Sequence, residues 1–392
     1  MKKVILIMLI AFSSKNMLSQ STIDTIISSV EQNNKSLSAY NKFIEAEKLS
    51  FKTGLTPSNP SLNYDYMIGY PSSAGNQTDF TVTQAFDFPS AYIKKKQLSN
   101  EKVSQLEFYL TSKRQEILLE TKLVCIELVY HNKYQSILEN RKNEAESLQS
   151  NYQKKLTTGD ISILDFNKVQ LQLIEVNKDY QINLSKINQL NQKLTELNGG
   201  NEIIFTDTIY PVLSSIPEFD VLENEIEKTD PIRKTLEQEV SIAENQVKLA
   251  KAMSLPKLET GYHYQGILGQ TFQGVHFGIT IPLWEDKNKV KQQKETLAFS
   301  DLELEAHKNE HYYDIKQLYE KYIGLKNTIE KYESVLNTFN SNLLLSKAFQ
   351  SGEISTTEYF VETNYYFNSY NNYLLTEKEF YQVVATLNKH KL

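Results

Sequence analysis

Two short segments of similar sequence determine the fold: Thr-Gly-Asp-Ile-Ser-Ile-Leu-Asp-Phe at residues 158–166, and Ser-Gly-Glu-Ile-Ser-Thr-Thr-Glu-Tyr at residues 351–359. Gly159 and Gly352 suit a tight turn between two helices, because glycine accepts positive φ. The acidic residue six positions later suits the first turn of a helix. Each glycine also lies 70 residues after a proline, Pro89 or Pro282. This shared spacing indicates an internal repeat.

The repeat extends toward the N-terminus. The interval from Lys35 to Pro60 is 25 residues, and so is that from Pro231 to Pro256. Three matched pairs in the same order indicate a duplication. We assign the first repeat to residues 21–200, a joining segment to 201–230 and the second repeat to 231–392.

The 70-residue stretches are expected to be helical. Residues at a spacing of seven form a mostly apolar seam from Val103 to Tyr152, and another from Val290 to Phe339. Such a seam predicts a helix that coils against neighbouring helices. At 1.5 Å per residue, about 65 helical residues extend roughly 100 Å. We expect long helices over 90–156 and 284–349, tip turns over 157–162 and 350–355, and return helices over 163–197 and 356–389.

Four segments alternate between apolar and polar residues with period two, which predicts strands. They cover residues 61–70, 78–88, 257–266 and 272–282, and a helix precedes each pair, over about 35–58 and 231–255. About ten residues suit a tilted transmembrane strand. The aromatic faces suit a lipid boundary, and we expect Tyr64, Tyr66, Phe80 and Phe277 to face lipid. A further short strand is expected at 203–209.

Four strands cannot close a barrel, and an open sheet edge in lipid leaves backbone groups unpaired. The chain therefore needs partner chains if the strands span a membrane. Two chains would supply eight strands around an interior filled with side chains, and three would supply twelve strands, which could leave a channel. The expected fold class is mainly α with a small β part.

Composition narrows the alternatives. Only 13 glycines and 9 prolines in 392 residues indicate a few very long elements. A net charge of −6 gives no electrostatic reason to expect a nucleic-acid partner. The single cysteine, Cys125, excludes an intrachain disulfide. Residues 1–20 combine two lysines, a short apolar run and a polar end, the layout of a secretory signal peptide.

The duplicated order of helix, two strands, long helix, glycine turn and return helix resembles the TolC-like outer-membrane efflux family. The more specific matches are Asn-Pro-Ser-Leu at 59–62, Gln84-x-Phe-x-Phe-Pro89 and the two glycine turns. The first two are more similar to the heavy-metal efflux branch. The resemblance implies a homotrimer with a twelve-stranded outer-membrane barrel and a helical tunnel through the periplasm. It also implies a periplasmic adaptor and an inner-membrane pump, of the RND type, as partners.

The resemblance also implies roles for particular residues. The tips that meet the adaptor would be Thr158, Gly159 and Asp160 with Ser351, Gly352 and Glu353. Asp165 and Glu358 match positions near the periplasmic aperture, where three copies of a carboxylate would favour cations; the alternative is that each acid offsets a helix dipole. Phe349 and Ile354 stand where the family often has a tyrosine and an arginine. We therefore expect apolar packing in place of a polar latch at the aperture.

One motif points toward another chemistry. His307-Lys-Asn-Glu310-His311 matches a pattern of zinc proteases, His-x-x-Glu-His. Because His311 falls on the heptad seam of a long helix, we expect no catalytic site, no cofactor and no metal site. The expected function is an exit duct for passive transport in a tripartite efflux pump. The alternatives are an exit channel for protein secretion, a soluble periplasmic coiled-coil scaffold and, least favoured, a metalloprotease.

Overall fold

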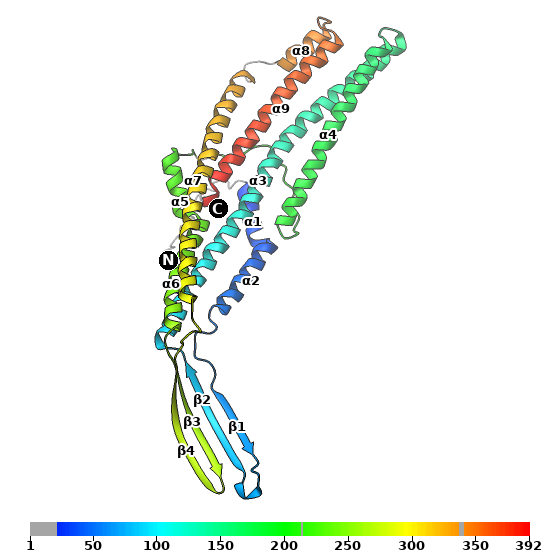
Figure 1. Ribbon diagram of the computed structural model, residues 1–392. Helices are drawn as coiled ribbons and strands as arrows, with labels where there is room; N and C mark the ends of the chain where they lie inside the picture. Colours follow the sequence, from blue (N-terminus) through cyan, green and yellow to red (C-terminus); the bar gives the residue numbers. More distant parts are fainter. Residues whose placement is uncertain (1–21, 213–214, 337–340) are drawn as a thin grey trace, which may run out of the picture. The chain divides into compact units, whose positions relative to one another are not determined.

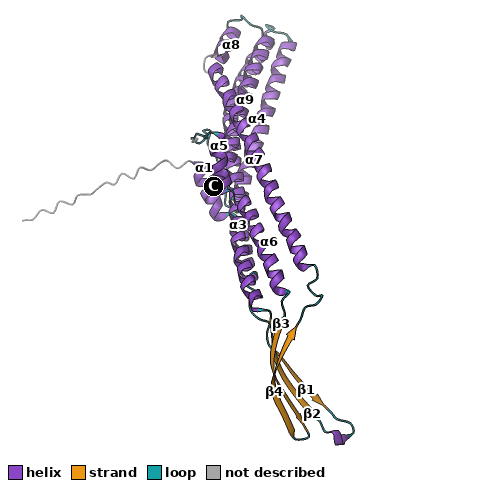
Figure 2. Cartoon of the chain, turned by 60° about the vertical axis from the view of Figure 1, so that its left-hand side comes forward, coloured by secondary structure: helices purple, strands orange, loops and turns teal. Residues whose placement is uncertain are grey.

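The computed structural model describes residues 22–212, 215–336 and 341–392. The predicted signal peptide, residues 1–20, lies outside this part. Among the described residues, helices dominate and one four-stranded sheet accompanies them (Figures 1 and 2), which confirms the expected mainly helical fold class. The helices are α1 (Thr22–Asn33), α2 (Lys35–Ser50), α3 (Pro89–Thr158), α4 (Ile163–Leu197), α5 (Phe219–Thr229), α6 (Pro231–Met253), α7 (Lys289–Leu336), α8 (Ser341–Gln350) and α9 (Thr356–Leu387).

The described chain divides into two compact units, and each unit combines segments of both repeats. Unit 1 lies within residues 1–34, 120–214 and 340–378, and unit 2 within 35–119, 215–339 and 379–392. The long helix α3 begins in unit 2 and ends in unit 1. Its first residue is Pro89, whose fixed φ and missing N–H suit the first position of a helix.

The sheet belongs to unit 2 and is antiparallel throughout. Its strands are β1 (Ser61–Met67), β2 (Gln77–Phe86), β3 (Lys257–Ile267) and β4 (Gln270–Thr280), in the order β1-β2-β3-β4. The central pairing joins β2 of the first repeat to β3 of the second. β1 and β4 are therefore the two edges of the sheet.

The core of unit 1 lies between helices. Leu128, Val129 and Leu138 of α3 are fully buried, as is Leu194 of α4. Nearer the tips, Tyr152, Phe166 and Val169 form a buried cluster on which Phe349 and Phe360 pack. The α3 seam positions Val124, Leu138, Ala145 and Tyr152 are all buried, as a coiled-coil seam should be.

Several predicted boundaries were wrong. The strand predicted over 61–70 ends at Met67. Met67 pairs with Gln77, the first residue of β2, so residues 68–70 have no partner on β2. The helix predicted over 35–58 ends at Ser50; α1 precedes it and was not predicted. The helix predicted over 284–349 starts only at Lys289, after Asn288 in a left-handed conformation with φ 70°. The rest of this predicted helix consists of α7 and α8, and residues 337–340 between them lie outside the described part.

The joining segment differs most from the prediction. Residues 203–209 form no strand in the described structure, and the chain bends at residue 209. Side chains satisfy their backbone in place of a partner strand: the Phe205 N–H donates to Asn191 Oδ1 (3.0 Å), and Asn132 donates to the Phe205 and Asp207 carbonyls (3.2 and 3.1 Å). The helix α5 in this segment was not predicted from the sequence either.

Candidate functional site

The two predicted tip turns have the same geometry. Gly159 and Gly352 have φ of 78° and 76°. In the first turn, Asp160 N–H donates to the Lys155 carbonyl (2.9 Å) and Gly159 N–H to that of Leu156 (3.2 Å). These bonds form a Schellman motif, which ends a helix with glycine in the left-handed region. Glu353 and Gly352 make the same pair of bonds in the second turn, at 2.9 and 3.2 Å.

The return helices begin with similar caps, each made by a serine and the acid three residues later. Asp165 N–H donates to Ser162 Oγ, and Ser162 Oγ donates to the Asp165 carboxylate (2.7 Å). In the second repeat, Glu358 N–H donates to Ser355 Oγ, and Ser355 N–H donates to the Glu358 carboxylate (2.8 Å). The bonds in the first repeat satisfy one backbone N–H at the start of the helix, and those in the second satisfy two. Both acids therefore have a capping role in their own chain.

These contacts also lower the pKa values of the two acids. Hydrogen bonds from Ser162, then from Lys168, lower the pKa of Asp165. Hydrogen bonds from the Ser355 backbone and side chain lower the pKa of Glu358. Both groups are exposed to solvent and ionised at neutral pH. Lys168 Nζ lies 3.4 Å from Asp165, so this carboxylate has a cationic neighbour in its own chain.

Three of the four predicted aperture residues come together. A groove of about 760 Å³ lies between the two tips of unit 1, and Asp165, Phe349 and Ile354 line it, while Glu358 does not. The ring of Phe349 stacks on that of Tyr359 with centroids 4.5 Å apart. The six predicted adaptor-docking residues, 158–160 and 351–353, are all exposed.

The sheet separates apolar from polar side chains. Directly paired residues lie on the same face, and Leu62, Val82, Tyr262 and Val275 form one such row. A neighbouring row on that face consists of Tyr64, Phe80, Tyr264 and Gln273, and Phe277 lies in a third row, beside Thr260. The opposite face carries polar and charged residues, among them Asn63, Thr81, His263, Asp79 and Glu259.

No other part of the described chain covers the apolar face of the sheet, so most of its side chains are exposed. Phe277 is 80% exposed and Tyr64 61% exposed, Tyr66 is exposed as well, and Phe80 is half-buried. The alternation predicted from the sequence therefore places all four candidate lipid-facing residues on one side of the sheet. Among the described residues, no helix is both long enough and apolar enough to cross a membrane.

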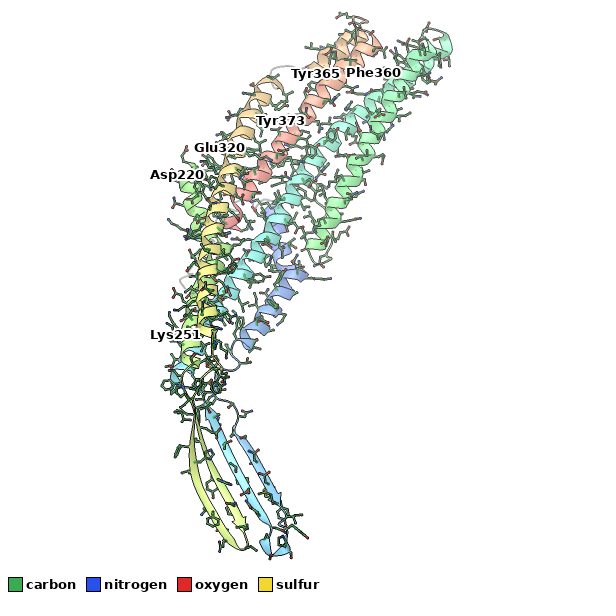
Figure 3. The ribbon with its side chains drawn as sticks, viewed as in Figure 1. Asp220, Lys251, Glu320, Phe360, Tyr365 and Tyr373 are labelled. Carbon is green, nitrogen blue, oxygen red and sulfur yellow. The ribbon has the colours of Figure 1, made fainter. Side chains whose placement is uncertain are left out.

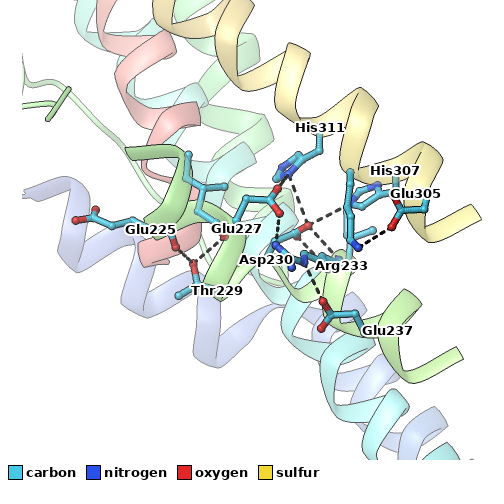
Figure 4. A network of polar contacts seen from close by, with 12 residues as sticks. Glu225, Glu227, Thr229, Asp230, Arg233, Glu237, Glu305, His307 and His311 are labelled. Atoms are coloured by element: carbon cyan, nitrogen blue, oxygen red, sulfur yellow. Dashed lines mark hydrogen bonds and ion pairs between the residues drawn. The ribbon is translucent and has the colours of Figure 1, made fainter. Parts of the chain in front are cut away.

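The two histidines of the protease-like motif lie in unit 2, in a polar network that includes Asp230 and Glu227 (Figure 4). Asp230 lies between α5 and α6, where it caps α6. Its proximity to the histidines was not predicted from the sequence, because 77 residues separate it from His307.

No protein-family profile and no curated protein matches the sequence. Solved structures do match. CusC, described as forming a transmembrane channel, aligns with a TM-score of 0.78 and 13% identity over 94% of this chain and 91% of its own. VceC, an outer-membrane protein of Vibrio cholerae, aligns with a TM-score of 0.76 and 12% identity over 94% of this chain and 95% of VceC. The CmeC outer-membrane channel of Campylobacter jejuni aligns with a TM-score of 0.74 and 14% identity over 94% of this chain and 85% of CmeC. The chain thus has the fold of TolC-like outer-membrane channels along nearly its whole length.

Proposed function

We propose that this chain is one subunit of a homotrimeric exit duct in the outer membrane. Three copies close a twelve-stranded barrel, and their helices line a tunnel in the periplasm. Substrates pass through by diffusion, with no covalent step. An inner-membrane pump of the RND type delivers them through a periplasmic adaptor.

One observation carries this proposal: a four-stranded sheet with one open apolar face and two edges, β1 and β4. Lipid would cover the apolar face of such a sheet. The edges could not be left unpaired there, because each unsatisfied backbone group costs several kcal/mol in hydrocarbon. Pairing β4 of one copy with β1 of the next satisfies both edges and leaves the polar face toward the channel.

The helix α4 supports the need for further copies. Its buried side includes Val169, Val176 and Leu190. At 100° per residue, a second set of apolar side chains falls within an arc of about 100° on the opposite side, interrupted by Asn167, Lys178 and Gln181. These five are all more than half exposed: Ile163, Leu164, Leu171, Ile174 and Ile182.

The helices α7 and α9 show the same excess of uncovered apolar surface. Phe299 and Leu302 of α7 are exposed, as is Tyr365 of α9, which Figure 3 labels. Monomeric proteins rarely expose apolar surface in continuous patches, which mark interaction sites. The neighbouring helices of other copies are the occupants that the proposal assigns to these faces.

The proposal assigns adaptor docking to the two exposed tips, residues 158–160 and 351–353. It assigns the periplasmic aperture to Asp165, Phe349, Ile354 and Glu358. The stacking of Phe349 on Tyr359 supports an apolar contact at the aperture. The motifs at 59–62 and 84–89 support the heavy-metal branch for the cargo.

A soluble scaffold is the less favoured function, because it would leave Phe277 and Tyr64 exposed to water. A metalloprotease is also less favoured, since the solved structures of this fold are described as channels and membrane proteins.

Single-channel recording in planar bilayers tests the duct and the aperture together. We expect discrete conductance steps with a preference for cations, because Asp165 and Glu358 are ionised. In the double variant Asp165→Asn, Glu358→Gln, conductance should remain and the cation preference should fall. Asparagine and glutamine each keep a side-chain oxygen, which can accept the hydrogen bonds that the two carboxylates accept from Ser162 and Ser355 at the starts of the return helices.

The matched control is Asp160→Asn, Glu353→Gln, which removes two acids from the tips and should leave selectivity close to that of the wild type. A protein that stays monomeric in water without detergent and gives no conductance would contradict the duct. Equal cation selectivity in the wild type and in the Asp165→Asn, Glu358→Gln variant would contradict the carboxylate ring but would leave the duct itself standing.

A further inference from the structure

The network in Figure 4 joins the corner between α5 and α6 to the helix α7. His307 Nε2 lies 3.2 Å from Asp230 Oδ2, and His311 Nδ1 lies 3.9 Å from the same oxygen. The two imidazole rings stack one helical turn apart, with centroids 5.3 Å apart and 14° between their planes. Three possible metal ligands thus converge from two elements that are distant in sequence.

We propose that Asp230, His307 and His311 bind one divalent transition-metal ion, with Zn²⁺ as the representative case. Two imidazole nitrogens and a carboxylate oxygen form a donor set that suits Zn²⁺, Ni²⁺ or Cu²⁺ better than Mg²⁺ or Ca²⁺. The remaining position of a tetrahedral ion would be open to water or to Glu227, whose Oε1 lies 2.9 Å from His311 Nδ1.

The distances fit such an ion. The three ligand atoms lie within 4.8 Å of one another. Ligands about 2.1 Å from a tetrahedral zinc ion are about 3.4 Å apart, so the ligand atoms would have to approach one another by about 1 Å, and the two stacked rings would have to rotate so that both nitrogens point at one ion. The hydrogen bonds now present would be replaced by bonds to the metal, with loss of any proton held between the groups.

The backbone holds Asp230 in position for this role. Its Oδ1 accepts from Ile232 N–H and its Oδ2 from Arg233 N–H, both at 3.0 Å. The residue is only 7% exposed, and such bonds around a ligating carboxylate orient it toward the metal. His307 and His311 remain partly exposed, so an ion can enter from solvent.

The local charge also favours a cation. Glu227, Asp230 and Glu237 surround Arg233, which forms ion pairs with both glutamates. These four groups carry a net charge of −2. A divalent ion would neutralise this charge and would connect α7 to the α5–α6 corner, so binding should stabilise unit 2.

Isothermal titration calorimetry of the full chain in detergent, with Zn²⁺ alone, tests the site. We expect one saturable site per chain and a zinc-dependent rise in the unfolding temperature. His307→Gln and His311→Gln should each weaken binding by at least about tenfold. Asp230→Asn should weaken it as well, although asparagine still caps α6.

Two other histidines provide the matched control. His263 lies 3.4 Å from Asp79 and His276 lies 3.1 Å from Glu259, each with a single carboxylate neighbour on the sheet. His263→Gln, His276→Gln should bind zinc as the wild type does. The proposal is wrong if the wild type shows no saturable site, or if the double variant His307→Gln, His311→Gln binds zinc as tightly as the wild type. Channel conductance is not a readout here, so failure of the site and failure of the duct are distinguishable.

Discussion

At the residue scale, the two tip glycines are among the positions where a positive φ restricts the choice of amino acid. Gly159→Ala and Gly352→Ala would force a Cβ into the left-handed region, at a cost of about 1–2 kcal/mol each. The space around both glycines is open, with nothing within 4 Å of an added Cβ, so steric clash adds nothing to this strain. Thermal unfolding should therefore show a lower midpoint for both variants.

Gly324 supplies the control within the same chain. It lies inside α7 and also has nothing within 4 Å of an added Cβ. Gly324→Ala should raise stability by about 0.5–1 kcal/mol, because alanine loses less backbone entropy in a helix. Equal effects of all three substitutions would contradict the role of positive φ at the tips.

The charge of Glu127 on α3 gives a pH-dependent prediction. Contact with the His131 imidazole, and with Lys186 at 3.3 Å, lowers its pKa from 4.5 to about 2, against the opposing effect of burial. A pKa lowered in the folded state stabilises that state above pH 4.5, and this contribution is lost as pH falls from about 4.5 toward 2. At neutral pH, Glu127→Gln should lower the free energy of unfolding by up to about 3 kcal/mol.

Urea unfolding in detergent at a series of pH values checks this prediction. The difference between wild type and Glu127→Gln should narrow steadily below pH 4.5. Glu175→Gln removes an exposed acid that pairs with Lys178 within one helix turn, and should change stability by less than about 0.5 kcal/mol. A difference between wild type and Glu127→Gln that stays constant with pH would contradict the electrostatic explanation.

At the scale of elements, the two faces of β4 give a paired test. Phe277 lies on the open apolar face, and its neighbour His276 lies on the polar face beside Glu259. Phe277→Arg should reduce assembly in the membrane, at a cost of about 2–4 kcal/mol per chain if the residue is near the bilayer midplane. His276→Arg should assemble normally, since an arginine there lies on the polar face and can still donate to Glu259.

Quantification of each variant in the outer-membrane fraction and as oligomer on mild gels measures this difference. If the apolar face packed on a soluble protein core, neither substitution would change the distribution between membrane and soluble fractions.

Much of the fold could be predicted from the sequence because its signals are local and repeated. The seven-residue seam, the period-two strands and the glycine turns depend on residues close together in the chain. The joining segment could not be predicted in this way. Residues 203–209 look like a strand, but Asn132 and Asn191, distant in sequence, take its backbone hydrogen bonds. The contact of Asp230 with the histidines is likewise a long-range contact that no local pattern records.

At the scale of the whole molecule, the buried Cys125 makes a direct test of edge pairing practicable. Its thiol is buried, and burial raises its pKa to about 12, so it should not react with maleimides in the folded protein. Cysteines can therefore be introduced at Asn63 in β1 and Gly274 in β4 without removing it. Across the sheet of one chain, these positions are about 14 Å apart, three strand spacings, and a shorter bifunctional maleimide cannot link them.

If β4 of one copy pairs with β1 of the next, the double variant Asn63→Cys, Gly274→Cys should give a ladder of covalent dimers and trimers in membranes. The ladder should end at three chains, because a closed ring of three has no free edge. The unsubstituted chain should give no links, and each single-cysteine variant should give no species larger than a dimer. Bands beyond three chains would contradict a closed trimer, and monomers alone would contradict the pairing of β1 with β4 on which the barrel depends.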